Sequence, residues 1–221
     1  PSAVKLSANA TGRCPSEQQF VAVLLFLCAL RFLMATVCVY CSSSNHIADT
    51  YPPVADALGR GLVARGHRLV YGGGTVGLMG VVARAVHDEG GTVIGVIPKK
   101  LESREGLAYD LADELVVTHT MQDRKRRMFT AADGFVVLPG GFGTLEEFLE
   151  VLTLKQLCYH DRPIVLVNTD GFFDPLLDFF GTLYEERFAR APISDVVHVA
   201  ATPSGALNHL DTVLAAASSA S

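Results

Sequence analysis

Short apolar runs alternate with amphipathic stretches along the chain from Met34 onward. Near-continuous apolar strands that alternate with helices are typical of a parallel sheet covered on both faces. The pattern therefore predicts an α/β fold, a Rossmann-like doubly wound parallel sheet in a single domain. The expected strands are Thr36–Cys41, Arg68–Tyr71, Thr92–Ile97, Glu114–Thr118, Gly134–Leu138, Pro163–Asn168 and Val197–Ala200. The expected helices are Tyr51–Arg65, Gly77–Glu89, Met121–Ala132, Gly143–Cys158, Asp174–Ala189 and Ser204–Ala216.

The first 33 residues have a different pattern. Pro1–Gln19 is polar, and Phe20–Leu30 is an unbroken apolar run that stops at Arg31. A helix that spans a bilayer needs about 20 apolar residues, and no small-residue cleavage site of a signal peptide precedes the first strand. We expect residues 1–33 to be an extension outside the fold and residues 34–221 to form the domain. A membrane anchor or a targeting segment is the alternative for the extension.

The stretch Pro139–Glu147 (PGGFGTLEE) joins the predicted strand Gly134–Leu138 to a predicted helix. A glycine-rich turn from a strand into a helix makes an anion site, because the uncovered N–H groups at the helix start point at the anion. Thr144 adds a hydroxyl donor, and Glu146 and Glu147 place carboxylates in the first turn. A plain phosphate cradle needs no acid there. Phosphate and carboxylate together suggest a nucleotide that is held while a bond near it reacts.

Two other loops follow strands, where ligands bind in sheets of this kind. Cys41–Asn45 is rich in serine, and its hydroxyls either bind a ligand or cap the next helix; the cap is favoured from this segment alone. Tyr71–Gly80 holds three consecutive glycines, which permit a positive φ and the close approach of a ligand. It matches neither the P-loop nor the dinucleotide-binding pattern. A tight turn with close helix packing explains it nearly as well.

A run of four cations lies within Met121–Met128, at the start of a predicted helix. Such runs are commonly a solvated helix face. This run stands in an acidic chain and follows the predicted strand Glu114–Thr118, so its start lies at the ligand-binding edge of the sheet. Arg124 in the first turn is therefore a candidate for contact with a nucleotide, whereas Arg126 and Arg127 are expected to face solvent.

Composition narrows the classes of function. The 221 residues have a formal net charge of −5 and no basic stripe, so we expect no nucleic-acid partner. The five cysteines are irregularly spaced, so no disulfide framework is implied and a reducing compartment is expected. Cys38 and Cys41 form a C-x-x-C pattern within an apolar strand, in which residues three apart face opposite sides. No second pair completes a zinc site, and we expect both thiols to be buried and no metal to be bound.

Taken together, these residues resemble the LONELY GUY family of cytokinin-activating phosphoribohydrolases, formerly described as lysine decarboxylase-like. The P-G-G-x-G-T-x-x-E motif of that family matches Pro139–Glu147, and its M-x-x-R-K motif matches Met121–Lys125 at a fitting separation. The resemblance covers about Thr36–Ala200. Further agreement lies at Tyr71–Gly74, Gly77–Gly80, Gly95–Lys99, Arg104–Glu105 and His160–Pro163.

By position, the resemblance implies that Arg124 and Glu147 are the catalytic pair. Ser42, Leu154 and Cys158 depart from the residues usual in the family, which bears on base specificity more than on the type of reaction. The nucleotide contacts that the resemblance implies are Glu105, Arg124, Lys125, Gly140, Gly141, Phe142, Gly143, Thr144, Leu145, Glu146 and Thr153.

The resemblance implies hydrolysis of the N-glycosidic bond of N6-substituted adenosine 5′-monophosphates, which releases the free base and ribose 5-phosphate. It also implies a cytoplasmic homodimer, with the helix after the glycine motif near the interface, that needs no cofactor and no membrane for its core domain. The residues suit this chemistry, because breaking the C1′–N9 bond builds positive charge on the ribose, which the Glu147 carboxylate can stabilise. Arg124 either holds the phosphate or favours departure of the base.

Two alternatives stay open. Unsubstituted AMP is one alternative as the main substrate, and a non-catalytic carrier of a nucleotide or of the molybdenum cofactor on the same fold is the other. Such a carrier has no need of the pair Arg124 and Glu147. A decarboxylase that uses pyridoxal phosphate has less support, because nothing assigns the Schiff-base role to Lys125.

Overall fold

The computed structural model describes residues 34–102 and 109–219. The predicted extension, residues 1–33, and the predicted nucleotide contact Glu105 lie outside the described residues. Within the described ranges, no helix is long and apolar enough to cross a bilayer.

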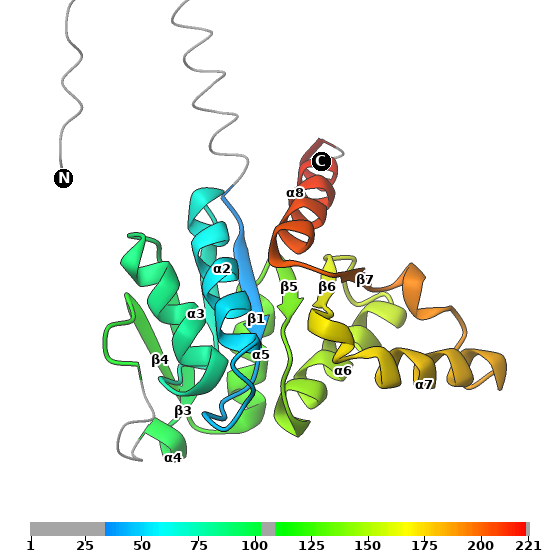
Figure 1. Ribbon diagram of the computed structural model, residues 1–221, viewed down its shortest axis with the longest axis horizontal. Helices are drawn as coiled ribbons and strands as arrows, with labels where there is room; N and C mark the ends of the chain where they lie inside the picture. The colour runs from blue at the N-terminus through cyan, green and yellow to red at the C-terminus, as the bar shows by residue number, and fades with distance from the viewer. Residues whose placement is uncertain (1–33, 103–108, 220–221) are drawn as a thin grey trace, which may run out of the picture. The chain divides into compact units, whose positions relative to one another are not determined.

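Seven parallel strands form one sheet in the order β4-β3-β2-β1-β5-β6-β7 (Figure 1). The chain winds outward from β1 to β4 and then places β5 on the other side of β1, so the strand order reverses between β1 and β5. Each strand lies within one residue of its expected bounds. The strands are β1 Thr36–Tyr40, β2 Arg68–Tyr71, β3 Val93–Pro98, β4 Glu114–Thr118, β5 Gly134–Val137, β6 Ile164–Val167 and β7 His198–Ala200.

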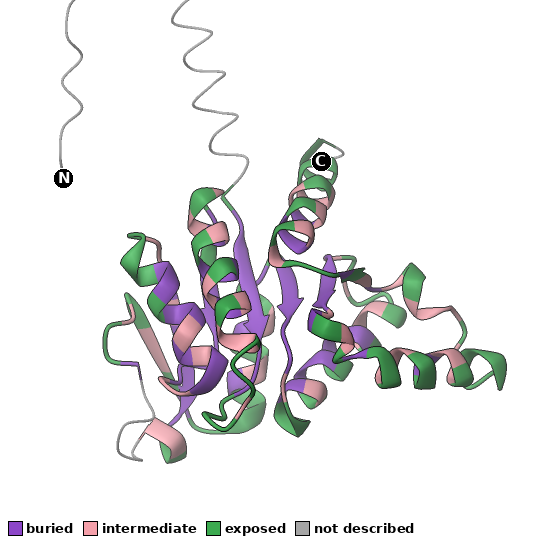
Figure 2. Cartoon of the chain, viewed as in Figure 1, coloured by how far each residue is buried: buried purple, intermediate pink, exposed green. Residues whose placement is uncertain are grey.

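Helices cover both faces of the sheet, which confirms the predicted doubly wound α/β fold. One apolar cluster joins the sheet to α2 (Tyr51–Ala64), α3 (Gly77–Asp88) and α8 (Pro203–Ser219). A second cluster joins the opposite face to α5 (Met121–Ala131), α6 (Phe142–Gln156) and α7 (Asp174–Glu185). Figure 2 shows the buried residues concentrated in the strands and on the helix sides turned toward them. The pattern did not predict the short elements α4 (Lys99–Glu102), η1 (Thr169–Gly171) and η2 (Ile193–Asp195).

Strand β1 shows how the pleat distributes side chains between the two clusters. Val37 and Val39 belong to the cluster under α2, α3 and α8, whereas Cys38 belongs to the cluster on the other face. Cys41, three residues after Cys38, lies in the first cluster, so the two thiols face opposite sides as predicted. Both thiols are free, and burial raises the pKa of each well above its ordinary value. These cysteines therefore act as core residues.

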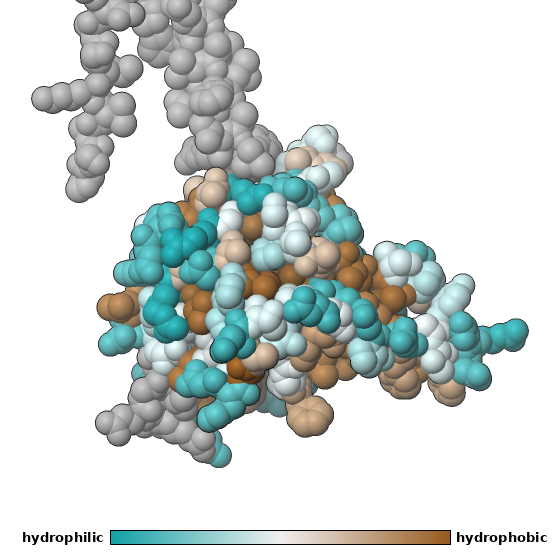
Figure 3. Space-filling model, viewed as in Figure 1, coloured by the Kyte–Doolittle hydropathy of each residue, from teal (hydrophilic) through white to brown (hydrophobic). Residues whose placement is uncertain are grey.

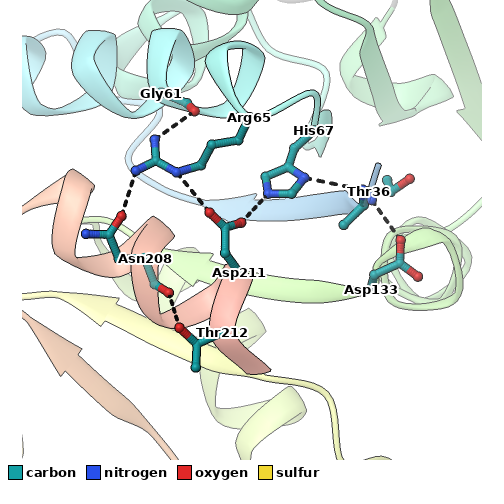
Figure 4. A network of polar contacts seen from close by, with 9 residues as sticks. Thr36, Gly61, Arg65, His67, Asp133, Asn208, Asp211 and Thr212 are labelled. Carbon is teal, nitrogen blue, oxygen red and sulfur yellow. Dashed lines mark hydrogen bonds and ion pairs between the residues drawn. The ribbon is translucent and has the colours of Figure 1, made fainter. Parts of the chain in front are cut away.

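A polar network joins α8 to the amino ends of β1 and β2 (Figure 4). Asp211 accepts a hydrogen bond from Nε of Arg65 at 3.0 Å and lies 2.7 Å from Nε2 of His67. Because the N–H group of Ala35 donates to Nδ1 of His67, the proton of this imidazole sits on Nε2 and points at Asp211. Arg65 also donates to Asn208 at 2.8 Å. The amino ends of parallel strands lie at the edge opposite the ligand-binding loops, so this network serves the fold.

Candidate active site

A cleft of about 470 Å³ lies at the carboxyl edge of the sheet, where the loops after β1, β2 and β5 meet. Backbone hydrogen bonds hold these loops together. The N–H group of Ser42 donates to the carbonyl of Pro139 at 3.2 Å, and that of Met79 donates to the carbonyl of Ser42 at 3.2 Å. The cleft therefore lies where the strand order reverses, between β1 and β5, which is the ligand position in open sheets of this type.

The glycine motif forms one wall of the cleft through the start of α6. Gly141 is the N-cap in an extended conformation, and among the described residues no side chain caps this helix. Because the first N–H groups of a helix lack partners within it, the uncapped α6 start favours an anion in the cleft. Thr144 is buried and lines the same wall. A methyl group on Gly140 would lie 2.6 Å from Cβ of Thr144, so this turn closes only with a glycine there.

A buried ion pair forms the floor between α5 and α6. Nη1 of Arg124 lies 2.7 Å from Oε1 of Glu147, and each residue is 8% exposed. Nε of Arg124 donates to the carbonyl of Val96 at 3.0 Å. Thr120 caps α5 by accepting the N–H of Asp123, which places Arg124 in the first turn.

The pKa of Glu147 is shifted in this pair. Burial raises the pKa of the Glu147 carboxyl above its ordinary value, and the Arg124 guanidinium opposes that rise. Two charges taken out of water seldom add net stability, because the desolvation cost offsets their attraction. A desolvated pair that lines a cleft is therefore better explained by chemistry than by stability.

The structure brings together in the cleft most of the residues that the family resemblance implied. These are Arg124, Gly141, Phe142, Gly143, Thr144, Glu146 and Glu147. Gly140 lies just behind this wall and lines an adjacent, smaller recess.

Besides Gly140, three implied contacts do not line the cleft. Nζ of Lys125 pairs with Glu146 and lies 3.3 Å from Oε2 of Glu150, so it joins α5 to α6. The bond to Glu146 raises the pKa of Lys125. Thr153 donates to the carbonyl of Leu149 within α6, further along the helix. Leu145 packs against the apolar cluster beneath α6.

The serine loop after β1 lines the cleft at Ser42, Ser43 and Ser44. The helix-cap interpretation favoured from the sequence is wrong, because Thr50 is the N-cap residue of α2. The serines instead close a turn: Oγ of Ser42 accepts the N–H of Ser44, and Oγ of Ser44 accepts the N–H of His46, each at 3.1 Å.

An apolar wall of the cleft was not predicted as part of a site. It is formed by Val76, Met79, Ile97, Leu101 and Met121, which come from four separate parts of the chain. In a single sequence, apolar residues that line a cleft cannot be distinguished from apolar residues of the core. Their gathering at one cleft follows only from the strand order.

Known proteins were compared with this chain. Residues 79–210 match the family described as possible lysine decarboxylase. The probable cytokinin riboside 5′-monophosphate phosphoribohydrolase LOGL2 of Oryza sativa subsp. japonica is 46% identical over 175 residues, which cover 79% of this chain and 71% of the relative. The cytokinin riboside 5′-monophosphate phosphoribohydrolase LOG of the same organism is 49% identical over 152 residues, which cover 69% of this chain and 62% of the relative.

Among solved structures, the Moco carrier protein from Chlamydomonas reinhardtii has a similar fold. Its TM-score is 0.65 at 25% sequence identity, over 83% of this chain and 99% of the carrier. The matched family region contains both motifs on which the resemblance was based, Met121–Lys125 and Pro139–Glu147. The chain belongs to the family described as possible lysine decarboxylase and, within it, to the LONELY GUY group of phosphoribohydrolases.

Proposed function

We propose that this chain hydrolyses the N-glycosidic bond of N6-substituted adenosine 5′-monophosphates and releases the free base and ribose 5-phosphate. The observation that carries the proposal is the buried Arg124–Glu147 pair in a cleft that also contains an uncapped helix start. The names of the relatives at 46% and 49% identity support the same reaction. Residues 34–221 are proposed as the catalytic unit.

The α6 end of the cleft is the proposed phosphate site. Gly141, Gly143 and the Thr144 hydroxyl offer neutral donors there, and the Ser42–Ser44 loop lines the same cleft. Binding energy from a phosphate that does not react can be used to position the sugar over the catalytic groups. A nucleoside without its phosphate should therefore be a poor substrate.

Glu147 is the proposed catalytic carboxylate. As the C1′–N9 bond breaks, positive charge builds on the ribose, and an adjacent carboxylate stabilises it. Glu147 also orients the attacking water: the water oxygen bonds to C1′, and the water proton ends on the departing base. Arg124 donates to the Glu147 carboxylate through Nη1 and to the carbonyl of Val96 through Nε. Nη2 makes neither of these two bonds, so it is the group of Arg124 that can bind a ligand.

The apolar wall supports a base with an apolar N6 substituent over plain AMP. Ile97, Leu101 and Met121 offer the base no hydrogen bond from their side chains, and an apolar substituent would gain by leaving water there. A non-catalytic carrier is the second candidate function, favoured by the likeness in fold to the Moco carrier. Release of the free base from a nucleotide distinguishes the hydrolase from a carrier.

We further propose a cytoplasmic homodimer that uses helices α6 and α7. Phe179 and Tyr184 of α7 are exposed, as are Leu149 of α6 and Phe188 beyond α7. Figure 3 shows apolar side chains gathered over the β6–β7 end of the sheet, with further apolar atoms along the lower edge of α7. Contiguous exposed apolar surface is typical of an interface. The free cysteines suit a reducing compartment.

Glu147→Gln tests the catalytic assignment. We expect turnover of isopentenyladenosine 5′-monophosphate to fall by about 10²- to 10⁴-fold, the range for removing a general base, with little loss of nucleotide affinity. Glu150→Gln is the matched control, because Glu150 lies one turn further along α6 and does not line the cleft. Retained turnover in Glu147→Gln would remove the proposed role.

A further inference from the structure

We infer that Gly72 is a positioning residue for the proposed reaction: the absence of a side chain there gives the Arg124 guanidinium room to pair with Glu147. Gly72 directly follows β2 and lines the cleft, whereas Arg124 reaches the same place from α5. A methyl group on Gly72 would overlap Nη2 of Arg124 and lie 3.1 Å from its Cζ. It would also lie 3.0 Å from Sδ of Met79.

The need for glycine at this position is one of space and not of backbone conformation. Gly73 has φ +73° and Gly77 has φ +60°, which a side chain rarely tolerates, but Gly72 is not among the residues with positive φ. The three-glycine run thus combines a turn at Gly73 with a space at Gly72. The turn at Gly73 agrees with one of the two explanations that the sequence left open for Tyr71–Gly80, and the space at Gly72 is an additional feature.

Arg124 cannot yield to a methyl group without losing its partners. Its Nε donates to the carbonyl of Val96 at 3.0 Å, and its Nη1 donates to Glu147 at 2.7 Å. Both bonds fix the plane of the guanidinium, which is itself buried. A methyl group on Gly72 therefore moves the guanidinium out of this plane and away from Glu147.

That methyl group should displace side chains of the active site and leave the fold intact. The nearest atoms to it are the ends of the Arg124 and Met79 side chains, which can move without the backbone. A methyl group on Gly77 would instead lie 2.7 Å from backbone atoms of Ser42, Ser43 and Ser44. Gly72→Ala thus displaces Arg124 in a protein that still folds.

This inference rests on the proposed pairing of Arg124 and Glu147 in catalysis. When Arg124 is displaced, Glu147 loses its nearest counter-charge, and burial together with the neighbouring Glu146 raises its pKa further, opposed only by Lys125. The acid limb of the pH–rate profile should then move to higher pH. A purely structural defect would lower the amount of folded enzyme and leave that limb in place.

The experiment uses Gly72→Ala in the full chain. We expect kcat for isopentenyladenosine 5′-monophosphate to fall about 100-fold, the effect of a misplacement of about 1 Å. The Glu147 carboxyl pKa, followed by ¹³C NMR without substrate, should rise above its wild-type value. In an Arg124→Gln background, Gly72→Ala should cause no further change in this pKa.

Gly61→Ala is the matched control. Its methyl group would lie 2.6 Å from Cδ1 of Leu207, which is also the end of a buried side chain, but in the contact between α2 and α8. It should lower the melting temperature and leave the Glu147 pKa and the pH–rate profile unchanged.

Three outcomes are distinguishable. An unchanged kcat and Glu147 pKa in Gly72→Ala would overturn the inference. Failure of Gly72→Ala to fold while Gly61→Ala folds would also overturn it, because the backbone rather than Arg124 would then resist the methyl group. If the wild-type chain releases no base from any nucleotide, the proposed function fails, and the NMR measurement still decides the role of Gly72.

Discussion

Replacing Arg124 with methionine removes the counter-charge of Glu147 and leaves an unbranched side chain in its place. Breaking a buried ion pair by removing one partner costs about 3–5 kcal/mol, because the other charge stays buried. The Val96 carbonyl also loses the Nε donor, which adds about 1 kcal/mol. We expect Arg124→Met to lose about 5 kcal/mol of unfolding free energy at pH 8. For a domain of this size, that loss lowers the melting temperature by about 10–20 °C.

The loss should depend on pH in a direction that the burial of Glu147 sets. Burial raises the pKa of Glu147 in the folded protein above its unfolded value, and removing Arg124 removes the largest opposing influence. A folded-state pKa above the unfolded value means that the folded state holds the proton more tightly. The cost of the buried charge is therefore absent below the unfolded pKa and grows as pH rises through the folded pKa. Arg124→Met should lose less stability at pH 5 than at pH 8.

A double variant separates chemistry from stability. Replacing a buried ion pair with apolar residues of similar size is often neutral or stabilising by about 1–4 kcal/mol. We expect Arg124→Met/Glu147→Leu to regain about the wild-type stability while it shows no turnover. Urea unfolding at pH 5 and pH 8 measures the unfolding free energy of the wild type, the single variant and the double variant. A double variant as unstable as the single one, or a single-variant loss that does not change with pH, would refute this reasoning.

Three further variants test other parts of the molecule. Thr144→Ala should raise KM for the nucleotide about tenfold, the value of one hydrogen bond to a charged group, and leave riboside turnover unchanged. Lys125→Met should lower the unfolding free energy by at most about 1 kcal/mol, because its partner Glu146 is half exposed; a tenfold rise in KM would instead assign Lys125 to the nucleotide. Asp211→Ala should cost about 2–3 kcal/mol in equilibrium unfolding, since Arg65 and His67 lose their acceptor, without changing kcat of the folded enzyme.

The sheet was predictable because each strand is an apolar run bounded by turn residues. Thr36–Tyr40, for example, ends one residue before the expected range, and Ile164–Val167 is one residue shorter than expected at each end. The strand order was not predictable in the same way, since periodicity does not show which strands pair. Elements of three or four residues, such as Lys99–Glu102, are too short to show a helical period.

The site residues were predictable where their chemical role depends only on their neighbours in the sequence. Pro139–Glu147 marks a helix start, and a helix start keeps its anion preference in any context. The direction of a side chain is less local: Arg124 and Lys125 are neighbours in sequence but point about 100° apart on α5, and only Arg124 reaches the cleft. The contribution of Met79 and Ile97 depends on how β2 and β3 are placed, so their own residue types do not reveal it.

The substrate comparison tests the central claim most directly. Purified protein is incubated with isopentenyladenosine 5′-monophosphate, AMP and isopentenyladenosine, and the released base is measured for each. The proposed function predicts the fastest release from isopentenyladenosine 5′-monophosphate, slower release from AMP and very little from the riboside. Equal release from the riboside would contradict the phosphate site at the start of α6, and no release from either nucleotide would contradict the hydrolase itself.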